Sequence, residues 1–152
     1  MLVDAKVGDI GSTAERYAHM FFGELGADAL TVNPYMGSDA VAPFLEYSTG
    51  ALEASERCVF LICLTSNPGA DDFETLPVDG CPLYRRVAEK AVEWSAIAPC
   101  GLVVGATRPQ AIRGLRELAE LGELELTELA SKSGSGRPNY HAYHNLPCQA
   151  RR

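Results

Sequence analysis

Three charged residues near the N-terminus have types and spacing that could move a proton. Asp4, Lys6 and Asp9 form an Asp-x-Lys-x-x-Asp pattern. Asp4 and Lys6 share the parity of a strand, so both side chains should point to one face, and Asp9 follows on a loop. A lysine between two carboxylates keeps its charge and can deliver a proton to a developing carbanion. The alternative is a solvated ion pair at a frayed start of the chain.

Three further polar runs each follow an apolar run that reads as a strand. They are residues 33–37 (NPYMG), 65–69 (TSNPG) and 105–107 (GAT). Each alone is typical of an ordinary turn, and Thr107 could simply cap the next helix. In a β/α barrel, however, the residues at the carboxyl ends of the strands line the active site. Together with the charged pattern, these runs predict one ligand-binding edge.

The elements that must position these residues alternate along the chain. Short apolar runs predict strands at 1–6, 29–33, 58–65, 102–104 and 124–126, and amphipathic patterns predict helices at 12–25, 39–47, 82–97 and 109–121. This alternation indicates an α/β fold with a parallel sheet and crossover helices. The strands are continuously apolar, so both faces of the sheet should be buried. The pattern fits a β/α barrel or a doubly wound sheet and does not choose between them.

The ends of the first helix carry specific signals. Ser12 and Glu15 have the spacing of a capping box, which predicts a helix start at Ser12. Gly26 predicts its end, because glycine readily takes the left-handed conformation that follows a helix.

Composition limits the classes of function. The chain has 152 residues, 47% hydrophobic and 22% charged, with a net charge of -7, which suits one globular domain. An acidic chain is a poor general binder of nucleic acid or of anionic membranes. No apolar run approaches the roughly 18 residues of a membrane span, and the N-terminus does not resemble a signal peptide. A small anionic substrate remains compatible with a local group of cations.

Cysteine and histidine usage predicts neither disulfides nor a metal site. The five cysteines form no CxxC pair, which is typical of reduced thiols in a cytoplasmic protein. His141 and His144 could contact a metal, but a disordered polar tail is the favoured interpretation of their segment. We therefore expect no metal.

The C-terminal segment differs from the rest. Residues 131–152 contain Ser, Gly, Pro, His and Arg with almost no apolar periodicity. We expect residues 1–130 to form the β/α domain and residues 131–152 to be a disordered tail. A second interpretation is that this segment is foreign to the fold.

The motifs resemble a known family in their order along the chain. Residues 4–13 (DAKVGDIGST), 30–37 (LTVNPYMG), 64–69 (LTSNPG) and 103–107 (VVGAT) resemble successive strand ends of orotidine 5′-phosphate decarboxylase, in its bacterial subgroup. The resemblance covers about residues 1–126. It implies a (β/α)8 TIM-type barrel, a homodimer, no metal and no organic cofactor. The implied reaction converts orotidine 5′-phosphate to UMP and CO2 in de novo pyrimidine biosynthesis.

The resemblance also implies roles for the charged residues. Lys6 would donate a proton to C6 of the pyrimidine. Asp4 would lie near the substrate carboxylate and hold the lysine. Asp9 would act across the dimer, in the partner's site.

Five further residues would bind substrate by the same resemblance. Ile10 and Thr13 would lie beside Asp9, and Ser66 would hydrogen-bond the pyrimidine ring. Asn33 and Pro68, in the runs that follow two strands, would complete this set.

The sequence departs from the family pattern in ways that bear on activity. The two strands expected before Asp4, one with a second catalytic lysine, have no counterpart, nor do the last two strands with their phosphate-binding loop and arginine. Val7 stands where a basic residue is expected. We therefore expect a partial barrel that is weak or inactive alone. One alternative is a related sugar-phosphate decarboxylase, which a requirement for Mg2+ would indicate. The other is a non-catalytic fragment that packs with another chain.

Overall fold

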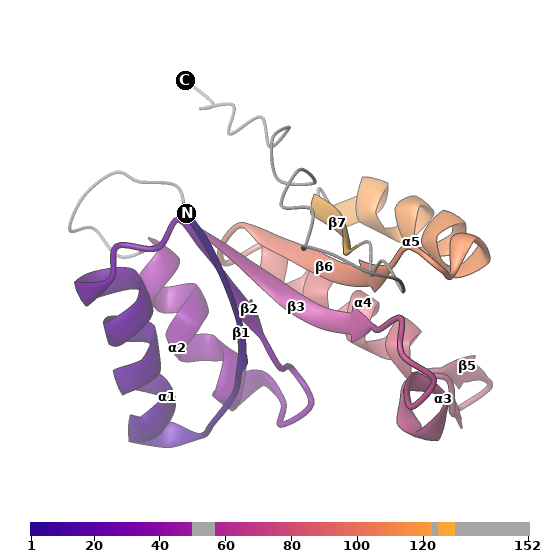
Figure 1. Cartoon of the computed structure of the whole chain (residues 1–152), viewed down its shortest axis with the longest axis horizontal. Coiled ribbons are helices and arrows are strands. Elements are labelled where there is room, and N and C mark those ends of the chain that lie inside the picture. The colour runs from indigo at the N-terminus through magenta and orange to yellow at the C-terminus, as the bar shows by residue number, and fades with distance from the viewer. Residues whose placement is uncertain (50–56, 123–124, 130–152) are drawn as a thin grey trace, which may run out of the picture.

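The computed structural model describes residues 1–49, 57–122 and 125–129, and Figure 1 shows how their helices and strands are arranged. A five-stranded sheet runs through this part of the chain. Its strands are β1 (Leu2–Val7), β2 (Ala29–Val32), β3 (Cys58–Leu64), β6 (Cys100–Gly105) and β7 (Glu125–Leu129). All neighbouring strands pair in parallel, in the order β1-β2-β3-β6-β7.

Helices connect the strands, as a parallel sheet requires. They are α1 (Gly11–Ala18), which continues as a π-helix (His19–Glu24), α2 (Ser38–Thr49), α4 (Leu83–Ser95) and α5 (Pro109–Gly122). Figure 1 shows α1 and α2 beside each other near β1 and β2, and α4 and α5 beside each other near β6. The α/β class and the alternation predicted from the sequence are confirmed.

The strand order decides between the two folds that the pattern left open. A doubly wound sheet reverses its strand order at a switch point, whereas these strands follow one another in chain order. The core is also asymmetric. Most buried residues pack between the helices and one face of the sheet, while the other face has a small cluster around Ala29, Phe60 and Val103. Sequential parallel strands with helices on one face form an arc of a β/α barrel.

Burial differs among the strands. β2 and β6 are buried along their whole length, as their apolar sequences predict. The expectation of burial on both faces is wrong for β1, in which Asp4, Ala5 and Lys6 are exposed. β1 lies at one end of the described sheet, so within the described residues it has a neighbouring strand on one side only. This is the strand that carries the charged residues.

The predicted capping box is wrong. Helix α1 begins at Gly11, after an extended Ile10 that makes no side-chain cap hydrogen bond, so Ser12 already lies inside the first turn. Gly11 has a φ of +54°, which allows the chain to turn into the helix before Ser12. The other end is as predicted, because Gly26 follows the last turn with a φ of +66°.

A small subdomain between β3 and α4 was not predicted. It contains α3 (Ala70–Phe73) and a hairpin of β4 (Pro77–Val78) and β5 (Cys81–Pro82). Asp79 and Gly80, both with positive φ, form the hairpin turn. These elements are too short to give a periodic pattern.

Among the described helices, none has both the length and the apolar character needed to cross a membrane. The predicted tail at residues 131–152, with its boundary after residue 130, lies outside the described residues.

Candidate active site

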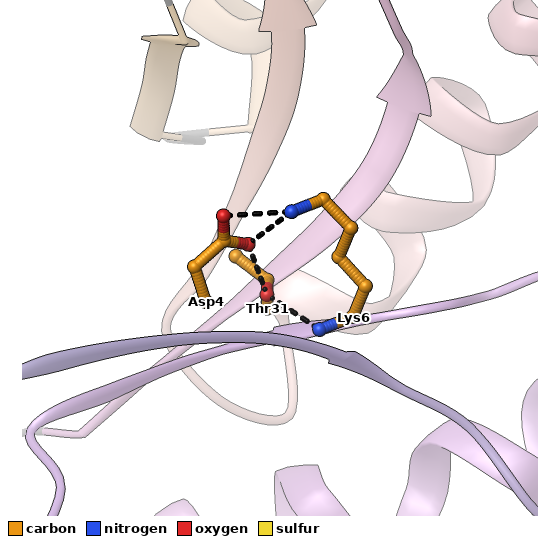
Figure 2. A network of polar contacts seen from close by, with 3 residues as sticks. All are labelled: Asp4, Lys6 and Thr31. Atoms are coloured by element: carbon orange, nitrogen blue, oxygen red, sulfur yellow. Dashed lines mark hydrogen bonds and ion pairs between the residues drawn. The ribbon is translucent and has the colours of Figure 1, made fainter. Parts of the chain in front are cut away.

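Asp4 and Lys6 form an ion pair on β1. The Lys6 Nζ atom lies 2.6 Å from Asp4 Oδ1 and 2.7 Å from Asp4 Oδ2, so the ammonium group donates to both carboxylate oxygens (Figure 2). The side chains are 48% and 41% exposed, respectively. The structure thus brings together the two residues that the sequence pattern places first, and it leaves them open to solvent in the single chain.

Thr31 joins this pair from the neighbouring strand. Its hydroxyl accepts a hydrogen bond from the Lys6 backbone N–H at 2.9 Å and donates one to Asp4 Oδ1 at 2.8 Å (Figure 2). Thr31 is 1% exposed and is the one buried polar side chain of the described residues. Its role was not predicted from the sequence. The available signal was a lone hydroxyl in the apolar run of residues 29–32.

The backbone of β1 is irregular where it carries the pair. Val3 pairs with Leu30 and Val7 with Val32, so four residue steps on β1 match two on β2. Lys6 has a φ of +48°, in the left-handed region that few residues other than glycine adopt. Bulges and unusual backbone angles of this kind re-aim side chains and are common beside active sites. The pair therefore lies on an irregular part of β1, where backbone geometry as well as strand alternation sets the direction of the side chains.

The surroundings of Asp4 favour its charged form. Partial burial alone would raise its pKa, but the hydrogen bonds from Lys6 and Thr31 and the positive charge of Lys6 together outweigh burial. The pKa of Asp4 is therefore lowered from its ordinary value, and at neutral pH the site presents a carboxylate beside an ammonium group.

The loop after β2 reaches the pair from one side. The Asn33 backbone N–H donates to the Val7 carbonyl at 2.8 Å, and its side-chain oxygen accepts from the Tyr35 N–H at 3.0 Å. Gly8 makes this approach possible, because a Cβ there would lie 2.9 Å from the Met36 side chain and 3.2 Å from Asn33. Asn33 is thereby held beside Lys6.

Lys6 and Asn33 share a cleft of about 450 Å³ at the carboxyl ends of β2 and β3. Besides Lys6, the charged residue that lines the cleft is Glu74. The remaining walls are mainly apolar and aromatic and include Tyr35 and Phe73. A cleft with few polar groups and apolar walls is typical of a small-molecule site. The volume suits a ligand the size of a nucleotide.

The loop after β3 carries Ser66 and Pro68. Ser66 packs directly on β6, since a Cβ on Gly105 would lie 2.8 Å from the Ser66 backbone nitrogen. The Pro68 carbonyl accepts the Asp71 N–H at 3.2 Å and so helps to start α3. Both residues lie at the same edge of the sheet as Lys6, but neither lines the cleft described above.

Two contacts that were not predicted from the sequence hold this loop. The Glu74 carboxylate accepts hydrogen bonds from the Thr65 N–H at 2.6 Å and from its hydroxyl at 2.9 Å. Arg108, after β6, lies 3.0 Å from an Asp71 carboxylate oxygen. No sequence spacing signals these pairs, because they join segments separated by a helix or a strand.

Asp9, Ile10 and Thr13 lie apart from the pair. The Asp9 carboxylate accepts the N–H of Ile10 at 2.8 Å, and Ile10 and Thr13 are exposed whereas Asp9 is half-buried. The structure does not bring Asp9 to Asp4 or Lys6 within one chain. Its expected action in a partner's site stays a prediction.

Within the described part of the chain, no group of three or more His, Cys, Asp or Glu side chains is placed to hold a metal ion. Both Asp4 oxygens already accept from Lys6.

Comparison with known proteins adds the decisive observation. The model of the Orotidine 5'-phosphate decarboxylase / HUMPS family matches residues 1–142. The chain belongs to this family. The match includes the Asp4–Lys6 pair and every loop described above, and it extends past residue 126, where the resemblance was expected to end.

Curated proteins that are similar in sequence carry the name of the same family. The chain is 45% identical over 149 residues to an orotidine 5'-phosphate decarboxylase of Azoarcus sp. The aligned region covers 90% of this chain and 53% of that protein. It is 50% identical over 119 residues to one from Herpetosiphon aurantiacus, covering 77% of the chain and 42% of the relative. The chain therefore spans about half the length of these curated relatives.

Solved structures confirm the fold. The Leishmania donovani OMP decarboxylase superposes with a TM-score of 0.70 at 44% identity, covering 78% of this chain and 45% of that one. The UMP synthase of the same organism gives a TM-score of 0.74 at 41% identity, covering 88% of this chain and 28% of that one. The partial β/α barrel expected from the motifs is confirmed.

Proposed function

We propose that this chain carries the reaction centre of an orotidine 5′-phosphate decarboxylase, which converts orotidine 5′-phosphate to UMP and CO2. The observation that carries the proposal is the Asp4–Lys6 ion pair at the carboxyl edge of the sheet, beside a cleft of nucleotide size. The family match and the names of the relatives support the same reaction.

The proposed chemistry follows from the charges of the pair. The substrate carboxylate lies near the Asp4 carboxylate, so repulsion disfavours the bound ground state. The bond between C6 and the carboxylate breaks, CO2 leaves and the electron pair stays on C6. The Lys6 ammonium group stabilises this carbanion and transfers a proton from Nζ to C6, which completes UMP. The neutral lysine then recovers a proton from water.

Substrate contacts come from the loops around the pair. We assign Ser66 to a hydrogen bond with the pyrimidine ring and Asn33 and Pro68 to the walls around it. Asn33 is supported by its place in the cleft with Lys6. Ser66 and Pro68 are supported by their position at the same edge of the sheet, held by Gly105 and Glu74.

A second copy of the chain is the proposed partner. In a homodimer, Asp9 would reach the partner's Lys6 site, with Ile10 and Thr13 against the bound nucleotide. The exposure of Ile10 and Thr13, and the position of Asp9 away from the pair of its own chain, support this arrangement. Ile10 is an apolar side chain that is 57% exposed at the start of α1, where a contact with a partner or ligand would cover it.

Turnover by this chain alone should be slow. Electrostatic stabilisation of a carbanion is strongest where water is excluded, and the side chains of Lys6 and Asp4 are 48% and 41% exposed in the single chain. We propose that the family members that it matches bury this pair more completely.

The thiols support a cytoplasmic location. Cys63, Cys81 and Cys100 are free thiols, as in proteins of reducing compartments. Burial raises the pKa of Cys100 to about 12, so this thiol stays protonated and unreactive.

The test of the proposed reaction is a substrate and metal comparison. The purified chain is given orotidine 5′-phosphate or a sugar-phosphate 3-keto acid, with and without EDTA. We expect slow, EDTA-resistant loss of orotidine 5′-phosphate. Turnover of the keto acid that EDTA abolishes would favour the related sugar-phosphate decarboxylase. No turnover of either substrate would favour a non-catalytic chain.

A further inference from the structure

Thr31 differs from the rest of its strand because its side chain carries a hydroxyl group. It lies in the middle of β2, where every other residue is apolar and buried. A valine would have nearly the same shape without a hydroxyl group to bury. Burying a hydroxyl is unfavourable unless it is hydrogen-bonded, so a role for its oxygen is needed.

Resting on the proposed function, we propose that Thr31 is a positioning residue of the reaction centre, which holds Asp4 and Lys6 in their working geometry through one hydroxyl group. The hydroxyl is the only described group that bonds both residues of the pair.

The two hydrogen bonds form a directed chain. The Lys6 N–H donates to Thr31 Oγ1, whose own hydrogen is then directed to Asp4 Oδ1. A hydroxyl has one hydrogen to donate and lone pairs to accept, and successive hydrogen bonds strengthen one another. This orientation favours a charged Asp4, which in turn keeps the Lys6 ammonium close.

The first bond also stabilises an unusual backbone. Lys6 has a φ of +48°, a conformation that costs free energy in a residue with a Cβ. In this conformation its N–H donates to the Thr31 hydroxyl, in a part of the ladder where the register between β1 and β2 is irregular. Loss of the hydroxyl would leave this donor without its acceptor, and the lysine would lose the restraint that turns Nζ back to Asp4.

The charged surroundings of Asp4 are simple enough for a clean test. From β1, Lys6 is the charged group that contacts it, and β2 contributes the neutral Thr31 hydroxyl. A change at Thr31 therefore reaches Asp4 through one hydrogen bond and through the position of Lys6.

The test uses the full chain labelled with 13C and 15N, as wild type, Thr31→Val and Thr31→Ser. The titration of the Asp4 carboxyl carbon and the exchange rate of the Lys6 amide hydrogen are followed by NMR, and Asp4→Asn identifies the Asp4 signal. Valine keeps the shape and removes the hydroxyl, and serine keeps the hydroxyl. Thr31→Ala, which also lacks the hydroxyl, replaces the valine variant if that variant does not fold.

We expect Thr31→Val to move the Asp4 pKa upward and to accelerate exchange at Lys6, and Thr31→Ser to restore both. Where the chain turns over orotidine 5′-phosphate, kcat should fall about tenfold in Thr31→Val, the effect of one hydrogen bond to a charged group, with little change in KM. An unchanged Asp4 titration and Lys6 exchange would overturn the proposal. Because the NMR measurements need no substrate, a failure of the decarboxylase assignment would be recognised separately, by the absence of turnover.

Discussion

Lys6 combines an unusual backbone conformation with a close ion pair. It has a left-handed backbone, and its ammonium group contacts both oxygens of a carboxylate two residues earlier. A flexible surface lysine gains little from an exposed ion pair, so stability alone does not explain a strained backbone at this point. At the scale of single residues, we interpret the site as a lysine held in place for chemistry.

Asp4 should give stability that depends on pH. Its lowered pKa means that the folded chain favours the charged carboxyl, so this contribution is complete above the pKa of an unfolded aspartate and is lost as pH falls through the folded pKa. We expect Asp4→Asn to lower the free energy of unfolding at pH 7 by no more than about 1 kcal/mol, because the pair is exposed.

Urea unfolding of both proteins at several pH values measures this difference. The difference should shrink as the pH is lowered below about 4, where an unfolded aspartate becomes protonated. A difference that stays constant with pH would mean that Asp4 contributes through packing or local structure and not through its charge.

Site residues could be predicted from the sequence only where their type and spacing were unusual. Asp4 and Lys6 were found because two charges in an apolar strand are unusual. Thr31 was not, because a threonine is common in strands and its importance depends on the register between β1 and β2. That register is irregular, with Val3 opposite Leu30 and Val7 opposite Val32, and alternation along one strand does not reveal it.

At the scale of elements, close approach of loops to strand ends shapes the site. Gly105 ends β6 where the Ser66 backbone lies against it, and a Cβ there would come within 2.8–2.9 Å of Ser66 atoms. Backbone atoms cannot rotate away as a side-chain end can, so the loop after β3 must shift if Gly105 gains a side chain.

We therefore expect Gly105→Ala to lower the free energy of unfolding by about 1–3 kcal/mol, as overpacking does. Gly114→Ala is the matched control, since Gly114 lies in α5 and a Cβ there meets no atom within 4 Å. It should be neutral or stabilise by up to about 1 kcal/mol, because alanine is the better helix former. Thermal and urea unfolding of both variants would show this ranking. Equal stability of the two variants would contradict the close packing of Ser66 on β6.

The elements themselves were predictable to different degrees. Long amphipathic helices and apolar strands gave a clear pattern, and α4, β3 and α5 appear where the pattern predicts them. The start of α1 was misplaced because Gly11 begins the helix before the serine that looked like its cap. The subdomain of α3, β4 and β5 was missed because a single helical turn and a two-residue hairpin have no period to detect.

At the scale of the whole molecule, strand order identified the fold where pattern could not. Pattern alone allowed a barrel or a doubly wound sheet, and only the pairing of β1-β2-β3-β6-β7 in chain order separates them. Pairing between strands is a long-range property, so it was available beforehand only through the family resemblance.

The proposed exchange of Asp9 between partners has a specific consequence. Lys6→Ala and Asp9→Asn should each be nearly inactive alone. In a mixed dimer of the two, one site would carry both defects and the other would be intact. An equal mixture should therefore recover up to about a quarter of the wild-type activity. Light scattering on the same samples would report whether dimers form.

Recovery of activity on mixing would support a site built from two chains. If the mixture is no more active than its components while dimers are present, Asp9 acts within its own chain or not at all. If the chain is monomeric at all concentrations, the proposed partner arrangement is wrong.

The central claim, that Lys6 performs the reaction, is tested most directly by the rate of orotidine 5′-phosphate loss in the wild type, Lys6→Ala and Lys90→Ala. Lys90 is the matched control, because it is an exposed lysine on α4 that also pairs with a carboxylate, Glu93. We expect Lys6→Ala to reduce kcat at least about a hundredfold, the effect of losing a general acid, and Lys90→Ala to leave it unchanged. Turnover that survives Lys6→Ala, or that falls equally in both variants, would contradict the account.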